Sequence, residues 1–90
     1  MMSDIQKVLH QRGQDYGDFC DVAATAQTIK MCWYVNTNLQ PYQREALDMI
    51  ANKIGRIANG DPFHDDSWVD IAGYATLVVE QNQLTRSRTK

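Results

Sequence analysis

Glycine and proline are scarce in this 90-residue sequence, which contains five Gly and two Pro. Hydrophobic residues make up 43% of the chain and charged residues 22%. A chain of this length and composition forms one compact domain without room for a second. We therefore expect a single domain rather than a multidomain enzyme.

Long apolar segments are also lacking. The charge-free run over residues 71–79 is far shorter than the roughly 20 apolar residues that cross a bilayer. The start, MMSDIQKVLH, has no long hydrophobic targeting core. We therefore expect no membrane association and a cytoplasmic location.

Cysteine and histidine occur twice each. If Cys20 and Cys32 lie on one helix, they are roughly 18 Å apart, which is beyond the reach of a disulfide. We expect reduced thiols that pack in the interior. Because His10 and His64 are isolated in the sequence, no zinc site is expected.

Positive charge is sparse except at the C-terminal end. The formal net charge is -2, all eleven acidic residues precede residue 85, and Arg86, Arg88 and Lys90 follow it. A basic duplex-binding surface is absent, so binding to duplex nucleic acid is not expected. We expect one helical domain over residues 1–84 and a flexible basic tail over residues 85–90.

The spacing of the apolar residues predicts four α-helices and no strand. Ser3 and Gln6 form a capping-box pattern at the first helix, and Asn59-Gly60 is typical of the end of the third. Trp33 and Trp68 fall on apolar stripes and are expected in the core. The helices are expected over residues 4–11, 18–35, 41–59 and 66–83, with a structured loop over residues 12–19.

These elements predict an all-α fold, a compact antiparallel four-helix bundle with a short first helix and three longer ones. Because so short a chain buries a limited fraction of its surface, we expect a homo-oligomer to complete the bundle.

One face of the helix predicted at residues 41–59 is polar. A solvated surface is one explanation of this pattern. However, Gly55 lies beside Asp48, and a mid-helix Gly costs about 1 kcal/mol relative to Ala. This glycine indicates close approach by another backbone or by a ligand. The polar face comprises Glu45, Asp48, Asn52 and Arg56, with Lys53 on its flank.

The helix predicted at residues 66–83 repeats the arrangement, with Asp70, Gly73 and Tyr74 on one face. A structural explanation for Asp70 is the capping-box pattern Ser67-x-x-Asp70. If both polar faces turn towards one cleft, carboxylates suit Mg²⁺ or Mn²⁺ and basic side chains suit phosphate. The metal ligands would then be Glu45, Asp48 and Asp70.

Tyr16, between two glycines, is a candidate for stacking on a nucleobase, and the alternative is packing on the end of the bundle. The residues predicted to bind a ligand are Tyr16, Asn52, Lys53, Arg56 and Tyr74.

Three spaced motifs carry a resemblance. RGQDYGDF, QREALDMIANKIGRIANGDP and DSWVDIAGYATLV, within about residues 12–79, closely resemble a family of small phage and prophage proteins with the pattern YGDF, EALDMIxxKIxRIxxGDP, DxxxDIAGYAxL. The DYG, KIxRI and DIxxYA elements are similar to the nucleotide-modification-associated phage domain and, more remotely, to the all-α MazG-like nucleotide pyrophosphatases.

The resemblance implies a phage-encoded helical domain of nucleotide-related ancestry, acting in the host cytoplasm. In the MazG-like group, two helices present ExxE and ExxD carboxylates to Mg²⁺, which activates a water for attack on phosphorus. Glu45-x-x-Asp48 matches the ExxD pair, whereas Asp66-x-x-x-Asp70 departs from ExxE. This departure favours binding over hydrolysis.

The leading hypothesis is a protein that binds a nucleotide between the third and fourth helices, with the Tyr16 loop of a neighbouring subunit as one arrangement. It would sequester or process a nucleotide, including a signalling nucleotide of host defence. The alternative is a non-enzymatic inhibitor or adaptor of a host protein, steered by its acidic surface. A third hypothesis is a metal-dependent nucleotide pyrophosphohydrolase.

Overall fold

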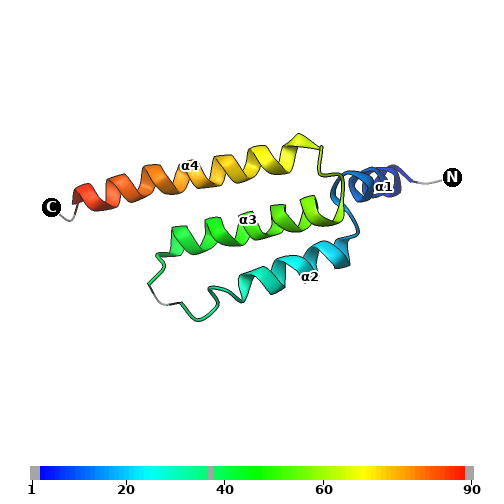
Figure 1. Cartoon of the computed structure of the whole chain (residues 1–90). Helices are drawn as coiled ribbons and strands as arrows, with labels where there is room; N and C mark the ends of the chain where they lie inside the picture. Colours follow the sequence, from blue (N-terminus) through cyan, green and yellow to red (C-terminus); the bar gives the residue numbers. More distant parts are fainter. Residues whose placement is uncertain (1–2, 37, 89–90) are drawn as a thin grey trace.

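The computed structural model describes residues 3–36 and 38–88, which form four α-helices and no strand. Helices α2, α3 and α4 lie side by side in an antiparallel layer with α3 in the middle, and α1 projects from one end (Figure 1). The described chain extends over 61 × 24 × 23 Å. The predicted all-α helical bundle is confirmed. The helices are α1 (Asp4–Tyr16), α2 (Phe19–Lys30), α3 (Pro41–Asn59) and α4 (Asp65–Arg88).

Helix α1 begins as predicted but is longer. The Ser3 hydroxyl accepts from the Gln6 amide at 3.1 Å, and the Gln6 side chain accepts from the Ser3 amide at 2.8 Å. The helix then continues through Gly13 to Tyr16, so the loop predicted over residues 12–19 is reduced to Gly17 and Asp18. Helical Gly13 costs about 1 kcal/mol relative to Ala. The tertiary packing of Tyr16 offsets this cost.

Helix α2 ends at Lys30, short of the predicted end at Val35. In the following turns, the amides of residues 32 and 33 donate to carbonyls three residues earlier. The guanidinium of Arg44, on α3, donates to the carbonyl oxygens of Trp33 and Asn36. A side chain distant in sequence thus satisfies the backbone beyond the helix end, which local spacing does not reveal.

Small residues bring α2 and α3 close together. Ala51 is 0% exposed, and a Cβ at Gly55 would lie only 2.7 Å from the carbonyl oxygen of Val22. The prediction that Gly55 marks the close approach of another backbone is confirmed. Helix α3 also has the predicted bounds.

Polar groups connect α3 to α4. Lys53 is only 8% exposed, and its Nζ lies 3.0 Å from Oδ2 of Asp70. Farther along, the Tyr42 hydroxyl donates to Oδ1 of Asn82 at 2.6 Å, and Nε2 of Gln43 donates to the same oxygen at 2.9 Å. These contacts determine how α4 lies against α3.

Helix α4 extends beyond the predicted end near Gln83 to Arg88, so residues 85–88 are helical in the structure. The interface with α3 reaches the last turns, since Asn82 contacts Tyr42. Residues 89–90 lie outside the described residues, and flexibility of the basic end stays a prediction. Within residues 3–36 and 38–88, no helix has the length and apolarity needed to cross a bilayer.

Several predicted core residues are not buried within the chain. Trp68 is 52% exposed, and its Nε1 donates to the carbonyl of Pro62 at 2.9 Å. Trp33 is half-buried, and Cys20 and Cys32 are free and exposed rather than packed. Three helices in one layer leave two open faces, so an apolar stripe on a helix is not necessarily covered.

Candidate functional site

A hollow of about 610 Å³ lies where α1 and α2 meet α3. Apolar residues of α1 and α2 form part of its wall, including Leu9, Phe19 and Val22. Its polar groups include Arg12 and Tyr16 from α1 and Asn52 and Arg56 from α3.

Tyr16 organises the basic groups of this hollow. The guanidinium carbon of Arg56 lies 4.6 Å from the centre of the Tyr16 ring, and that of Arg12 lies 5.3 Å from it. Cations in this position are attracted by the negative face of an aromatic ring. The Tyr16 ring therefore holds two guanidinium groups close together at the hollow.

Tyr16 is anchored on its other side by residues near the start of α4. Its hydroxyl donates to Oδ2 of Asp66 at 3.1 Å. The ring of His64 packs edge-on against the Tyr16 ring, with the two ring centroids 5.2 Å apart. Nε2 of His64 lies 3.3 Å from the same Asp66 oxygen but makes no hydrogen bond, although it is buried. The Tyr16 side chain thus contacts α3, the loop before α4 and the first turn of α4.

Two glycines make this arrangement possible. Gly17 has φ +89°, and a Cβ there would lie 2.4 Å from the carbonyl oxygen of Asn59. A Cβ at Gly60 would lie 2.4 Å from the carbonyl carbon of Tyr16, and the Asp61 amide donates to the Asp15 carbonyl at 3.0 Å. The ends of α1 and α3 therefore touch through their backbones.

Burial raises the pKa of Tyr16 above its ordinary value of 10.0, and the hydrogen bond and negative charge of Asp66 raise it further. The positive charges of Arg12 and Arg56 act in the opposite direction. Tyr16 is therefore protonated at neutral pH and donates to Asp66.

Replacing Asp66 by Asn is expected to lower the pKa of Tyr16, because the carboxylate opposes ionisation of the phenol. The raised pKa in the folded state also means that the contribution of Tyr16 to stability is complete below the unfolded value of 10.0. That contribution is lost as the pH rises through the folded pKa. An NMR titration of the Tyr16 ring measures the shift.

The matched control is Asp65→Asn, which removes an exposed neighbouring carboxylate outside the Tyr16 contacts. An unchanged pKa of Tyr16 in Asp66→Asn, or an equal decrease in Asp65→Asn, would contradict the hydrogen-bonded arrangement.

The structure brings together three of the five residues predicted to bind a ligand. Tyr16, Asn52 and Arg56 surround the hollow, and Tyr16 comes from the same chain. Lys53 is instead buried against Asp70, and Tyr74 lies half-buried on α4 outside the residues that line this hollow. The hollow lies beside α1 and α2, rather than between α3 and α4 as the sequence predicted.

Sequence reasoning did not identify Arg12, Phe19, His64 and Asp66 as parts of this region. Arg12 precedes Tyr16 by four residues, a spacing that places both on one helical face. The predicted loop over residues 12–19 concealed that signal. His64 and Asp66 contact Tyr16 because the backbones at Gly17 and Gly60 bring the ends of α1 and α3 together. No local sequence pattern predicts this contact.

The three predicted metal ligands are not gathered into one group. Asp48 accepts from Nε1 of Trp33 at 3.0 Å, Asp70 pairs with Lys53, and Glu45 is exposed. No cluster of three His, Cys, Asp or Glu suited to a metal ion occurs in the described part of the chain. This arrangement does not fit a Mg²⁺ or Mn²⁺ centre. Metal binding stays a prediction for titration to test.

Comparison with known proteins gives one match. A family model described as Domain of unknown function (DUF6378) matches residues 1–82. No curated protein and no solved structure matches the chain.

Proposed function

We propose that this chain, which belongs to the family described as Domain of unknown function (DUF6378), binds a nucleotide in the hollow between α1, α2 and α3. The observation that carries the proposal is the pair of guanidinium groups, Arg12 and Arg56, held on Tyr16. Neither forms an ion pair with any residue of the described chain. Their hydrogen-bond donors are therefore available to an anion.

The phosphate groups would bind to these arginines. A guanidinium has five N–H donors in a planar fork that matches the geometry of phosphate oxygens. Asp18 also lines the hollow, but its Oδ2 accepts from the amides of Cys20 and Asp21 at 3.1 and 3.3 Å. The positive end of α2 further offsets this carboxylate. An anion at the arginines thus meets a net attraction.

The base would lie against the apolar wall. Phe19 and Leu9 are both exposed and line the hollow. An aromatic ring stacks on any base with an energy of about 1–3 kcal/mol. The amide of Asn52 can donate to or accept from the edge of a base. The volume of about 610 Å³ is adequate for a ligand of nucleotide size.

The proposal is binding rather than hydrolysis, because Asp48 accepts from Trp33 and Asp70 pairs with Lys53, so the predicted metal ligands are not gathered into one group. Sequestration of a nucleotide, including a signalling nucleotide of host defence if the chain is phage-encoded, is the finer form of this proposal. The similarity of the DYG, KIxRI and DIxxYA elements to the nucleotide-modification-associated phage domain supports it.

Isothermal titration calorimetry with nucleoside mono-, di- and triphosphates and cyclic dinucleotides tests the proposal. Each is titrated with and without Mg²⁺ or Mn²⁺. Arg56→Ala and Arg12→Ala are each expected to weaken binding about tenfold to a hundredfold, because a charge-assisted hydrogen bond contributes about 1.5–3 kcal/mol.

Lys7→Ala is the matched control. It removes a cation from the face of α1 opposite the hollow, since residues 7 and 9 point in widely different directions around the helix. Its affinity should equal that of the unchanged chain. Heat changes from none of the nucleotides would overturn the proposal and favour the alternative, an inhibitor or adaptor of a host protein. Metal-dependent release of phosphate or pyrophosphate would favour the pyrophosphohydrolase hypothesis.

A further inference from the structure

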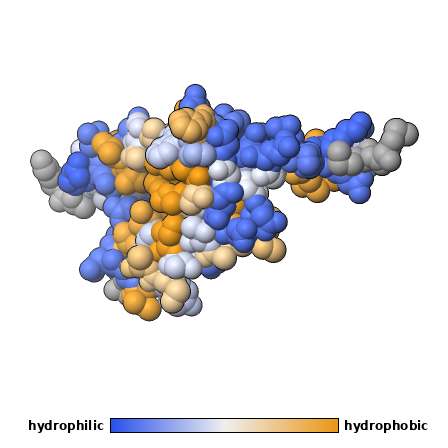
Figure 2. Space-filling view, turned by 45° about the vertical axis from the view of Figure 1, so that its right-hand side comes forward, coloured by the Kyte–Doolittle hydropathy of each residue, from blue (hydrophilic) through white to orange (hydrophobic). Residues whose placement is uncertain are grey.

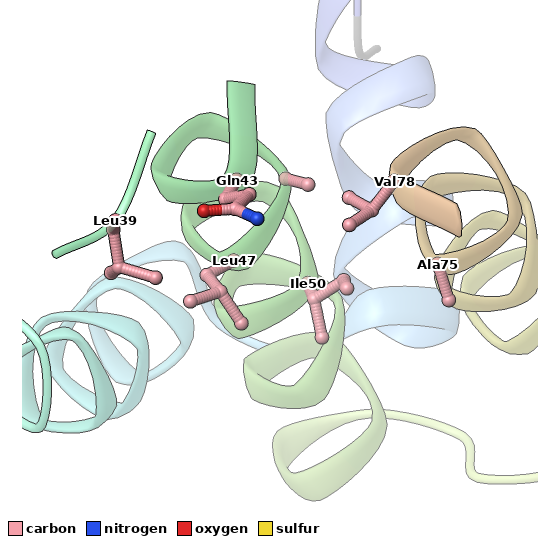
Figure 3. Close-up of a pocket in the computed structure, with 7 residues that line it drawn as sticks. Leu39, Gln43, Leu47, Ile50, Ala75 and Val78 are labelled. Carbon is pink, nitrogen blue, oxygen red and sulfur yellow. The ribbon is translucent and has the colours of Figure 1, made fainter. Parts of the chain in front are cut away.

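The layer of α2, α3 and α4 has two open faces, and the one that does not carry the hollow is apolar along α3 and α4. Between α3 and α4 a groove of about 340 Å³ is lined by seven residues, none of them charged. Figure 3 shows Leu47 and Ile50 of α3 and Ala75 and Val78 of α4 around it, with Leu39 beside them. Hydrophobic residues also gather in a band on the face of the molecule seen in Figure 2.

Helical spacing extends this face along both helices. Ile54 follows Ile50 by one turn of α3, and Val79 follows Ala75 by one turn of α4. Trp68 precedes Ala75 by two turns and lies on the same side. All three are exposed. We call the surface made by Leu47, Ile50, Ile54, Trp68, Ala75 and Val79 the α3/α4 face.

The chain alone exposes more surface than a folded monomer of its size. Its accessible surface is 6755 Å², whereas a 10.3-kDa monomer is expected to expose about 5,350 Å². No large side chain of the described residues is fully buried. The excess, about 1,400 Å², includes the projecting α1 but exceeds the about 800 Å² that each partner contributes to a typical stable interface.

From this area and from the charge pattern, we infer that the α3/α4 face binds the same face of a second copy of this chain, forming a two-fold symmetric dimer. In such a contact each residue near the axis meets its own symmetry mate, so a charged patch would repel itself. The α3/α4 face has no charged residue at its groove, which suits this arrangement. A phospholipid surface would instead favour basic residues here.

The dimer buries the missing half of the core. Four helices, an α3 and an α4 from each copy, enclose the side chains that one layer leaves in water. The hollow with Arg12 and Arg56 opens on the other side of α3, where Asn52 lies about 160° around the helix from Ile54. Dimer formation therefore leaves the hollow accessible and does not depend on the proposed nucleotide binding.

Two valines of α4 provide a matched test. Val79 and Val69 are 53% and 65% exposed, but Val79 lies on the α3/α4 face and Val69 points outward, away from α3. In analytical ultracentrifugation over a wide concentration range, the unchanged chain and Val69→Glu are expected at twice the 10.3-kDa chain mass. Val79→Glu is expected at the single-chain mass, with the helical circular dichroism retained.

Ile54→Glu, on α3, repeats the test if Val79→Glu does not fold. A single-chain mass for the unchanged protein at all concentrations overturns the inference, as does a dimer that persists in both variants. If Val69→Glu also loses the dimer, the contact between the two copies is not confined to the α3/α4 face, and the inference is overturned. Titration of the monomeric Val79→Glu variant with nucleotides tests the proposed function separately from the dimer, because the hollow is not part of the α3/α4 face.

Discussion

Gly17→Ala is expected to lower the free energy of unfolding by about 3 kcal/mol. Gly17 has φ 89° and ψ 176°, a backbone conformation that only glycine adopts without strain of about 1–3 kcal/mol. The added Cβ would also lie 2.4 Å from the Asn59 carbonyl oxygen, so α1 and the end of α3 would have to move apart. Urea denaturation followed by circular dichroism measures the change.

Gly13→Ala, within α1, is the control for Gly17→Ala at the C-cap of the same helix. A Cβ at Gly13 meets nothing within 4 Å, so alanine is expected to stabilise α1 by up to about 1 kcal/mol. The two substitutions thus have opposite signs although they introduce the same methyl group. If Gly17→Ala were as stable as the unchanged chain, the backbone crossing that positions Tyr16 would not exist in solution.

Asp70→Ala is expected to lower the free energy of unfolding by about 2 kcal/mol. It leaves the ammonium group of Lys53, at 8% exposure, without its partner. Removing one partner of a fully buried ion pair costs about 3–5 kcal/mol. The smaller value is expected here because the side chain of Asp70 is 46% exposed, so that water can replace part of the interaction.

The double variant Lys53→Met with Asp70→Ala supplies the control, because it removes the buried charge together with its partner. Replacement of an ion pair by apolar groups is often neutral, so the double variant should recover most of the lost stability. Measurements without divalent metal distinguish this role from the predicted metal ligation. A metal ligand with no structural role would leave metal-free stability unchanged in Asp70→Ala, and that result would falsify the pairing.

The individual helices were largely predictable from local patterns, and their exceptions have tertiary causes. The apolar stripe, Pro41 and Asn59-Gly60 predicted the bounds of α3 because each acts within a few residues. The end of α2 and the continuation of α1 were not predictable. The end of α2 depends on Arg44, whose guanidinium donates to the carbonyl oxygens of Trp33 and Asn36. The continuation of α1 depends on Tyr16, which packs against Arg56 and donates to Asp66.

The candidate site was partly predictable for the same reason. Asn52 and Arg56 share a helical face at a spacing of four residues, and Tyr16 was singled out by its flanking glycines. Lys53 was predicted to bind the ligand because it lies on the flank of the same face, three residues before Arg56. Residues three apart on a helix point about 60° apart, and this rotation directs Lys53 to Asp70 and Arg56 to the hollow.

The sequence by itself determined an all-α chain with four helices, because its long amphipathic stretches contain few glycine or proline residues. The glycine at position 55 also indicated a close contact. Only the tertiary structure decided which polar groups meet, that the basic hollow lies beside α1 and α2, and that an apolar face remains open. The physical reason is that the two kinds of interaction act over different distances along the chain. Helix periodicity and capping act over three or four residues, whereas these decisions depend on backbone contacts such as Gly17 with Asn59 and Gly55 with Val22, between residues far apart along the chain.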